Sequence, residues 1–202
     1  MNKWLMHPVA KPTVFALCLL PFFWLLYLAM ADQLGANPQE ALIRATGDWA
    51  LRFLCIVLAV TPLRVLSKTP GVARFRRMLG LFMYFYVLIH FLSYSGFDMG
   101  FDMVEIVADI IKRPFILVGA LSLLLLTPLA ATSFNAAIKA LGAKRWQQLH
   151  MLIYAVAGLA VLHFFWMRAG KNDFAEVAVY AGILALLLGW RLHQYSRSRA
   201  KS

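Results

Sequence analysis

The chain has 202 residues, of which 62% are hydrophobic and only 14% are charged. This apolar share is well above the roughly 45–50% of an ordinary soluble domain, and a soluble fold would need charged side chains along all of its helices. The net charge of +11 does not indicate nucleic-acid binding, because the basic residues lie in short connectors beside apolar stretches. We therefore expect an all-α membrane protein.

Six segments are long and apolar enough to cross the hydrocarbon core of a bilayer, which takes about 20 helical residues. We expect these spans at about 13–31, 49–66, 78–95, 114–131, 147–167 and 174–192. The first is longer than the roughly 7–15 apolar residues of a signal peptide, so we expect it to be retained. No soluble domain, low-complexity linker or internal repeat stands out, and we expect residues 1–202 to form one six-helix bundle in a single domain.

The lysines and arginines predict the orientation of this bundle. If the N-terminus is cytoplasmic, fourteen of the 20 basic residues fall on the cytoplasmic side, and all 9 acidic residues, from Asp32 to Glu176, fall on the other side. Both termini are therefore predicted to be cytoplasmic. The outer stretch 96–113 mixes acidic and apolar residues, and it forms either a short amphipathic helix on the outer membrane surface or an ordered loop packed on the bundle.

The two cysteines, Cys18 and Cys55, lie within apolar segments, so we interpret both as buried apolar side chains and not as a disulfide. The sequence contains no Cys-x-x-Cys pair, no motif for covalent heme attachment and no zinc-ligand spacing. It also lacks a Gly-x-Gly-x-x-Gly motif, so the chain is not expected to oxidise a nicotinamide by itself.

Three of the 5 histidines lie within expected spans, where an ionisable side chain is costly and indicates a functional site. The third and fifth spans run in the same direction, and His90 and His163 lie at similar distances from their outer ends. Two imidazoles at one depth can ligate one heme iron from opposite sides and leave no open position, which favours electron transfer. The alternative is two unrelated interhelical polar contacts. His7 and His193 are expected in loops.

The remaining histidine, His150, lies 13 residues before His163, which places it about 20 Å nearer the cytoplasm. At that depth the third span offers Arg77 and no histidine. His150 could bind a second heme with an unusual partner, contact a quinone or flavin, or cap the inner end of its helix. The basic cluster of Arg74, Arg76 and Arg77 could hold a heme propionate or a flavin phosphate, or it could serve only to anchor the cytoplasmic side.

A series of short stretches follows in order from the second to the fifth span. They are Thr61-Pro62-Leu63-Arg64, Arg76-Arg77-Met78-Leu79-Gly80-Leu81, Tyr86-Val87-Leu88-Ile89-His90, Lys112-Arg113-Pro114-Phe115-Ile116-Leu117-Val118-Gly119, Thr127-Pro128-Leu129-Ala130-Ala131-Thr132-Ser133, Trp146-Gln147-Gln148-Leu149-His150 and His163-Phe164-Phe165-Trp166. Together with the length and topology, this series resembles the MsrQ (YedZ) family. Its members are heme-binding membrane subunits of bacterial periplasmic methionine sulfoxide reductase systems, within the ferric-reductase-like transmembrane group.

The resemblance implies b-type heme held by His90, His150 and His163, with one heme expected and a second left open. The family is also associated with FMN and with quinol oxidation. Its partner is a periplasmic molybdenum-cofactor subunit that reduces methionine sulfoxide in damaged envelope proteins. The chain would thus be a multi-pass electron-transfer subunit of the bacterial inner membrane, and not itself the site of substrate reduction.

The electron donor implied by the resemblance is the quinone pool or a separate cytosolic flavin reductase. Two other functions share part of the pattern. A stand-alone ferric or quinone reductase could use the same heme core. A non-redox transport or assembly protein is the other alternative, but transport is disfavoured because the charges lie at the edges of the spans and no repeated, broken helices are evident.

Overall fold

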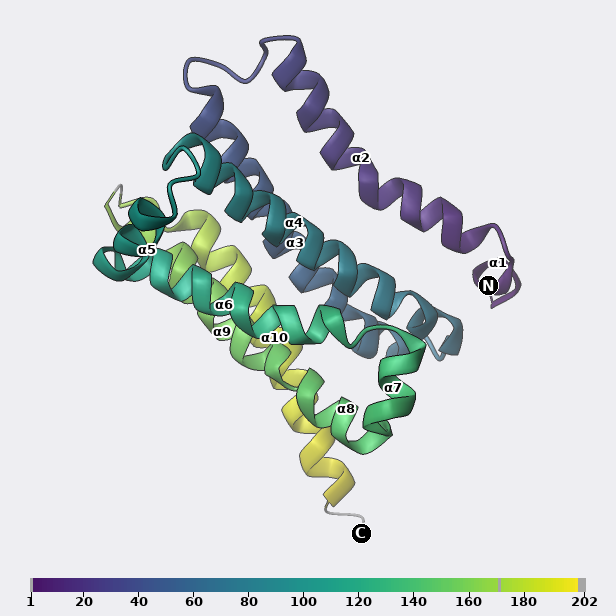
Figure 1. Cartoon of the computed structure of the whole chain (residues 1–202). Helices are drawn as coiled ribbons and strands as arrows, with labels where there is room; N and C mark the ends of the chain where they lie inside the picture. The colour runs from purple at the N-terminus through teal and green to yellow at the C-terminus, as the bar shows by residue number, and fades with distance from the viewer. Residues whose placement is uncertain (1, 171, 200–202) are drawn as a thin grey trace.

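The computed structural model describes residues 2–170 and 172–199, and over these residues the chain is helical, with no strand. Within this part of the chain, six helical segments are long and apolar enough to cross a membrane. Figure 1 shows the long helices running across the molecule in one general direction. The expected all-α bundle of six spans is confirmed. Lys171 and Lys201, which contribute to the predicted charge asymmetry, lie outside the described residues, as do the side chains of Lys3 and Arg199.

The helices follow one another with short connections. They are α1 (Asn2–Met6), α2 (Ala10–Met30), α3 (Pro38–Leu66), the 3-10 helix η1 (Pro70–Phe75), α4 (Arg76–Phe97), α5 (Met103–Lys112), α6 (Pro114–Ala131), α7 (Asn135–Leu141), α8 (Ala143–His150), α9 (Leu152–Ala169) and α10 (Ala175–Arg199). The helices α2, α3, α4, α6 and α10 correspond to five of the expected spans. The remaining expected span, 147–167, covers the end of α8 and most of α9, which follow each other with only Met151 between them.

The second span is the one whose extent differs most from the expectation, because α3 begins at Pro38 and not near Trp49. Its N-terminal part is polar, so apolar length does not detect it. Local helix-start signals explain it: the Asn37 side chain accepts the Glu40 N–H at 3.2 Å, and proline occupies the first helical position. Glu40 also pairs with Arg44 one turn later, at 2.5 Å.

Two helical hairpins form the centre of the bundle, since α3 packs along α4 and α6 packs along α9. The α3–α4 interface is aromatic. Phe53 stacks on Tyr86 with ring centres 5.1 Å apart, Phe82 lies against Phe53 at 6.1 Å, and Tyr86 has no exposed surface. Buried aromatic pairs of this kind contribute packing specificity beyond their buried area, so this interface fixes the register of α4 against α3.

Helix α2 is attached to this core by the Tyr86 hydroxyl. The hydroxyl donates to the Cys18 carbonyl at 2.9 Å and accepts the Phe22 N–H at 3.1 Å. These two backbone groups are one helical turn apart beside Pro21, which interrupts the helical hydrogen bonds of α2. A side chain inserted at this point satisfies backbone groups that lipid cannot.

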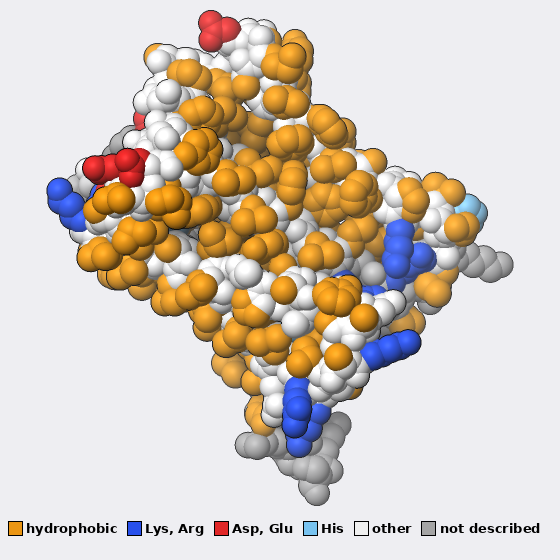
Figure 2. Space-filling model, viewed as in Figure 1, with side chains coloured by type: hydrophobic (Ala, Val, Ile, Leu, Met, Phe, Trp, Pro, Cys, Tyr) orange, Lys and Arg blue, Asp and Glu red, His pale blue; other side chains and the backbone are white. Residues whose placement is uncertain are grey.

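The acidic residues gather at one end of the bundle, whereas basic residues lie at both ends. Figure 2 shows lysine and arginine without aspartate or glutamate at the end that carries α1, α7 and α8, and it shows acidic side chains with basic ones beside them at the end that carries α5. Between the two ends the visible surface is largely apolar, as a membrane-crossing surface must be. Helix α1 and the last turns of α10 both lie toward the end that shows only basic residues.

The outer stretch after α4 forms the helix α5, which packs on the bundle through the buried Ile106. The Tyr94 hydroxyl of α4 donates to Asp109 of α5 at 2.6 Å, and Asp109 also pairs with Arg113. The Arg113 guanidinium is the main reason that the pKa of Asp109 is lowered. The opposite face of α5 exposes Met103, Val104, Val107 and Ile111.

Candidate heme site

The imidazoles of His90 and His163 lie next to each other near the acidic end of the bundle. His90 comes from α4 and His163 from α9, so each central hairpin supplies one ring. The ring centres are 6.1 Å apart and the ring planes are inclined by 80°. The structure therefore brings together the two histidines that the sequence places at one depth.

A backbone carbonyl holds each of these rings. Nδ1 of His90 donates to the Ile43 carbonyl of α3 at 2.8 Å, and Nδ1 of His163 donates to the Phe115 carbonyl of α6 at 2.6 Å. A carbonyl oxygen can only accept, so Nδ1 carries the proton in both rings. Nε2 of each neutral imidazole then keeps its lone pair and can bind a metal.

The separation of the rings fits a metal held between them. Two metal–nitrogen bonds of about 2 Å, together with the distance from each nitrogen to its ring centre, give about 6 Å between ring centres. Among the described residues, no group of three or more His, Cys, Asp or Glu side chains could hold a metal ion without further ligands. Two imidazoles alone suit an iron whose other ligands come from a porphyrin, so these residues fit a heme.

His150 lies apart from this pair and is the C-terminal residue of α8. Its Nε2 lies 3.1 Å from the Thr132 hydroxyl, and its ring stacks on Trp146 with centres 4.0 Å apart. Trp146 in turn donates from Nε1 to the Thr132 carbonyl at 2.9 Å. These contacts connect α8 to the end of α6 and fix the position of the imidazole.

A cavity of about 390 Å³ opens beside His150, which is within the range of small-ligand pockets. Its polar lining includes Arg76 and Arg77 of α4, His150, and Arg191 of α10, and none of the lining residues is acidic. Arg77 and His150, which the sequence places at matching depth, thus line one cavity. Arg74 does not line this cavity and donates to the Leu5 carbonyl of α1 at 2.5 Å.

Known heme-binding membrane subunits are similar to this chain over most of its length. The family described as "Ferric reductase like transmembrane component" matches residues 46–161. The "Protein-methionine-sulfoxide reductase heme-binding subunit MsrQ" of Polaromonas naphthalenivorans is 70% identical over 99% of this chain and 92% of its own length. The protein of the same name from Herminiimonas arsenicoxydans is 49% identical over 95% of this chain and 88% of its own length. The chain belongs to the MsrQ family. No solved structure matches it.

Membership in the MsrQ family and the six apolar helices make the chain a multi-pass protein of a bacterial inner membrane. The ferric-reductase-like match contains His90 and His150 and ends two residues before His163. It also ends before α10, so Arg191 is a cavity residue that neither this match nor the sequence analysis singles out. Arg191 donates to the Tyr154 hydroxyl and to the Leu58 carbonyl, both at 2.8 Å.

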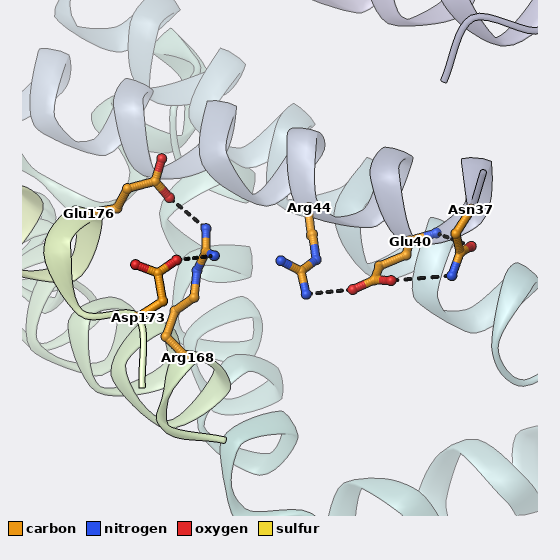
Figure 3. A network of polar contacts seen from close by, with 6 residues as sticks. All are labelled: Asn37, Glu40, Arg44, Arg168, Asp173 and Glu176. Atoms are coloured by element: carbon orange, nitrogen blue, oxygen red, sulfur yellow. Dashed lines mark hydrogen bonds and ion pairs between the residues drawn. The ribbon is translucent and has the colours of Figure 1, made fainter. Parts of the chain in front are cut away.

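Two groups of charged and polar side chains lie near the acidic end of the bundle, and Figure 3 shows them. Arg168, five residues after His163, reaches Asp173 at 3.0 Å and Glu176 at 2.5 Å and ties α9 to the start of α10. Arg44 directly follows the carbonyl-bearing Ile43 and pairs with Glu40. These ion pairs lie on α3 near Ile43 and on α9 near His163.

Proposed function

We propose that this chain is a membrane electron-transfer subunit that holds a b-type heme between His90 and His163. We further propose that it passes electrons to a periplasmic molybdenum-cofactor methionine sulfoxide reductase. The observation that supports the heme is the facing pair of imidazoles, each with Nδ1 engaged by a carbonyl. The names of the relatives, heme-binding subunits of protein-methionine-sulfoxide reductase, support the partner.

The residues around the pair suit electron transfer. A bound heme would accept and release one electron at a time. The carbonyls of Ile43 and Phe115 make the two imidazoles more basic and restrict their rotation. A heme held by His90 and His163 would have no coordination position left for a small substrate, so the site would serve electron transfer and not oxygen chemistry.

The charge separation supports an orientation in which the basic end faces the cytoplasm. Both termini and the inner cavity then lie on the cytoplasmic side, and the histidine pair lies toward the periplasm. In that orientation the end that carries the acidic side chains, with basic ones beside them, would face the periplasmic partner, and the acidic side chains would speed the encounter with a basic docking surface.

The inner cavity is the proposed entry point for electrons, with FMN as its occupant. Arg76, Arg77 and Arg191 can pair with a phosphate, and the stacked Trp146 and His150 rings lie beside the space for an aromatic group. A second heme is less well supported, because Arg77 is not one of the usual axial ligands. Quinol or a cytosolic flavin reductase would supply the electrons.

The six spans are proposed to work as one domain. Helix α10 lies outside the ferric-reductase-like match, yet it contributes Arg191 to the inner cavity and accepts Arg52 of α3 through the Tyr180 hydroxyl, at 3.2 Å. A bundle without α10 would lack Arg191 at the cavity and would leave Arg52 without the Tyr180 hydroxyl.

The proposed heme ligands can be tested by pyridine hemochrome analysis of the purified protein, which gives heme type and content together. His90→Ala and His163→Ala should each reduce the content of b-type heme to near zero, since one imidazole cannot hold a six-coordinate heme. His193→Ala is the matched control and should keep full content. Normal heme content in both variants would refute this pairing, and a wild-type protein without heme from heme-supplied cells would refute the cytochrome function.

The proposed partner needs a separate measurement. The purified protein is reduced with dithionite, excess reductant is removed, and reoxidation is followed at the heme absorption band. Reoxidation by the periplasmic molybdenum subunit with methionine sulfoxide present is expected. Reoxidation by ferric chelate or quinone, but not by that subunit, would instead identify a stand-alone reductase.

A further inference from the structure

The two histidines are held by the same local arrangement in two different hairpins. In each case the carbonyl that accepts Nδ1 lies four residues before a glycine on the same helix. On α3 the carbonyl belongs to Ile43 and the glycine is Gly47; on α6 they are Phe115 and Gly119. The sequence does not reveal this similarity between the two hairpins, because it consists only of a backbone carbonyl and of the absence of a side chain four residues later.

Helix geometry explains why the glycine stands at that position. Every Cα–Cβ bond of an α-helix tilts toward the N-terminus, so the side chain of residue i+4 lies over residue i. A side chain at position 47 or 119 would therefore cover the carbonyl at position 43 or 115. A glycine at this position leaves the carbonyl accessible to an imidazole ring from the neighbouring helix.

The distances show how closely each ring occupies this space. A Cβ added to Gly47 would lie 3.1 Å from both Nδ1 and Cε1 of His90. A Cβ added to Gly119 would lie 2.9 Å from Nδ1 and 3.0 Å from Cε1 of His163. Neither ring can move aside freely, because its Nδ1 is the atom that donates to the carbonyl.

We propose that Gly47 and Gly119 are positioning residues of the heme site. Each glycine, with the carbonyl four residues before it, forms a seat that sets the rotation of one imidazole. The two seats together hold the ring planes at 80°. This inference rests on the proposed heme ligation by His90 and His163.

The seats predict a graded effect. Gly119→Ala brings Cβ closer to its ring than Gly47→Ala does, so it should disturb the site more. Changes in residues that orient metal-ligating histidines commonly weaken metal binding about 10–100-fold. We expect a loss of heme affinity of about 10-fold or more for Gly119→Ala and a smaller loss for Gly47→Ala.

The readout is heme titration of the heme-depleted full-length protein, together with EPR of the ferric form. The EPR anisotropy of a low-spin heme depends on the angle between its imidazole planes, so a displaced ring changes the signal even when heme is retained. Gly158→Ala on α9 and Gly182→Ala on α10 are matched controls, because a Cβ there meets nothing within 4 Å. Unchanged affinity and EPR signal in both seat variants would overturn the proposal.

A double-mutant cycle on the heme-depleted protein tests the seat even if a variant binds no heme. Gly119→Ala should lower the apparent Tm when His163 is present, and should be neutral or stabilising in the His163→Ala background, because alanine favours a helix over glycine. The same holds for Gly47 with His90. A Tm loss of equal size in both backgrounds would overturn the inference. Retention of heme by His90→Ala and His163→Ala would instead overturn the proposed ligation and leave this cycle unaffected.

Discussion

At the scale of single residues, Arg191 connects the sixth span to the cavity beside His150. By its place in the sequence it counts only as one of the basic residues that orient the bundle, near the end of a long apolar helix. Its hydrogen bonds to Tyr154 and Leu58 turn the guanidinium inward. A charged group at a span edge can thus belong to a ligand site as well as to the topology signal, and hydropathy alone does not distinguish the two.

Arg191→Gln should weaken FMN binding about 10-fold or more, because a hydrogen bond to a charged group contributes roughly 1.5–3 kcal/mol. Riboflavin, which lacks the phosphate, should bind the variant and the wild type equally. Fluorescence titration with both flavins measures the difference, and Arg197→Gln on the exposed end of α10 serves as the control. Equal FMN affinity in all three proteins would show that Arg191 does not bind the phosphate. No FMN binding at all would refute the flavin proposal.

At the scale of helices, the contact between Tyr86 and α2 is the clearest single attachment. Tyr86→Phe removes the hydroxyl that bridges the Cys18 carbonyl and the Phe22 N–H. We expect a loss of about 1–3 kcal/mol of stability, seen as a lower unfolding temperature in detergent and faster proteolysis between α2 and α3. Tyr84→Phe is matched to it, because the Tyr84 hydroxyl bonds Thr127 in an exposed position. Equal stability of the two variants would contradict this role.

Helices also show what could be predicted from the sequence. Apolar length identifies all six spans, and α6 begins and ends where expected, at Pro114 and Ala131. The outer part of α3 was missed because residues such as Glu40 and Arg44 interrupt the apolar pattern there. Equal depth of His90 and His163 follows from counting along two parallel helices. The seats at Gly47 and Gly119 do not, because they depend on how neighbouring helices are rotated against each other.

At the scale of the whole molecule, the separation of basic and acidic ends predicts which loops face which compartment. Gln33→Cys lies in the exposed connection after α2, and Ala140→Cys lies on the exposed surface of α7 at the opposite end. In intact cells with a permeable outer membrane, a membrane-impermeant thiol reagent should label only the cysteine at position 33. The cysteine at position 140 should react only after the inner membrane is opened. The native Cys18 and Cys55 give the background, and the reverse labelling pattern would invert the proposed orientation.

The division of the histidine pair between two hairpins has a consequence for how the protein is made. The α3–α4 hairpin carries His90 and its seat, and the α6–α9 hairpin carries His163 and the other seat. Under the proposed ligation, the first half would enter the membrane during synthesis with only one ligand. Heme capture would then have to wait until the ribosome has delivered residue 163 and the second hairpin has inserted, which would make cofactor loading a late step in biogenesis.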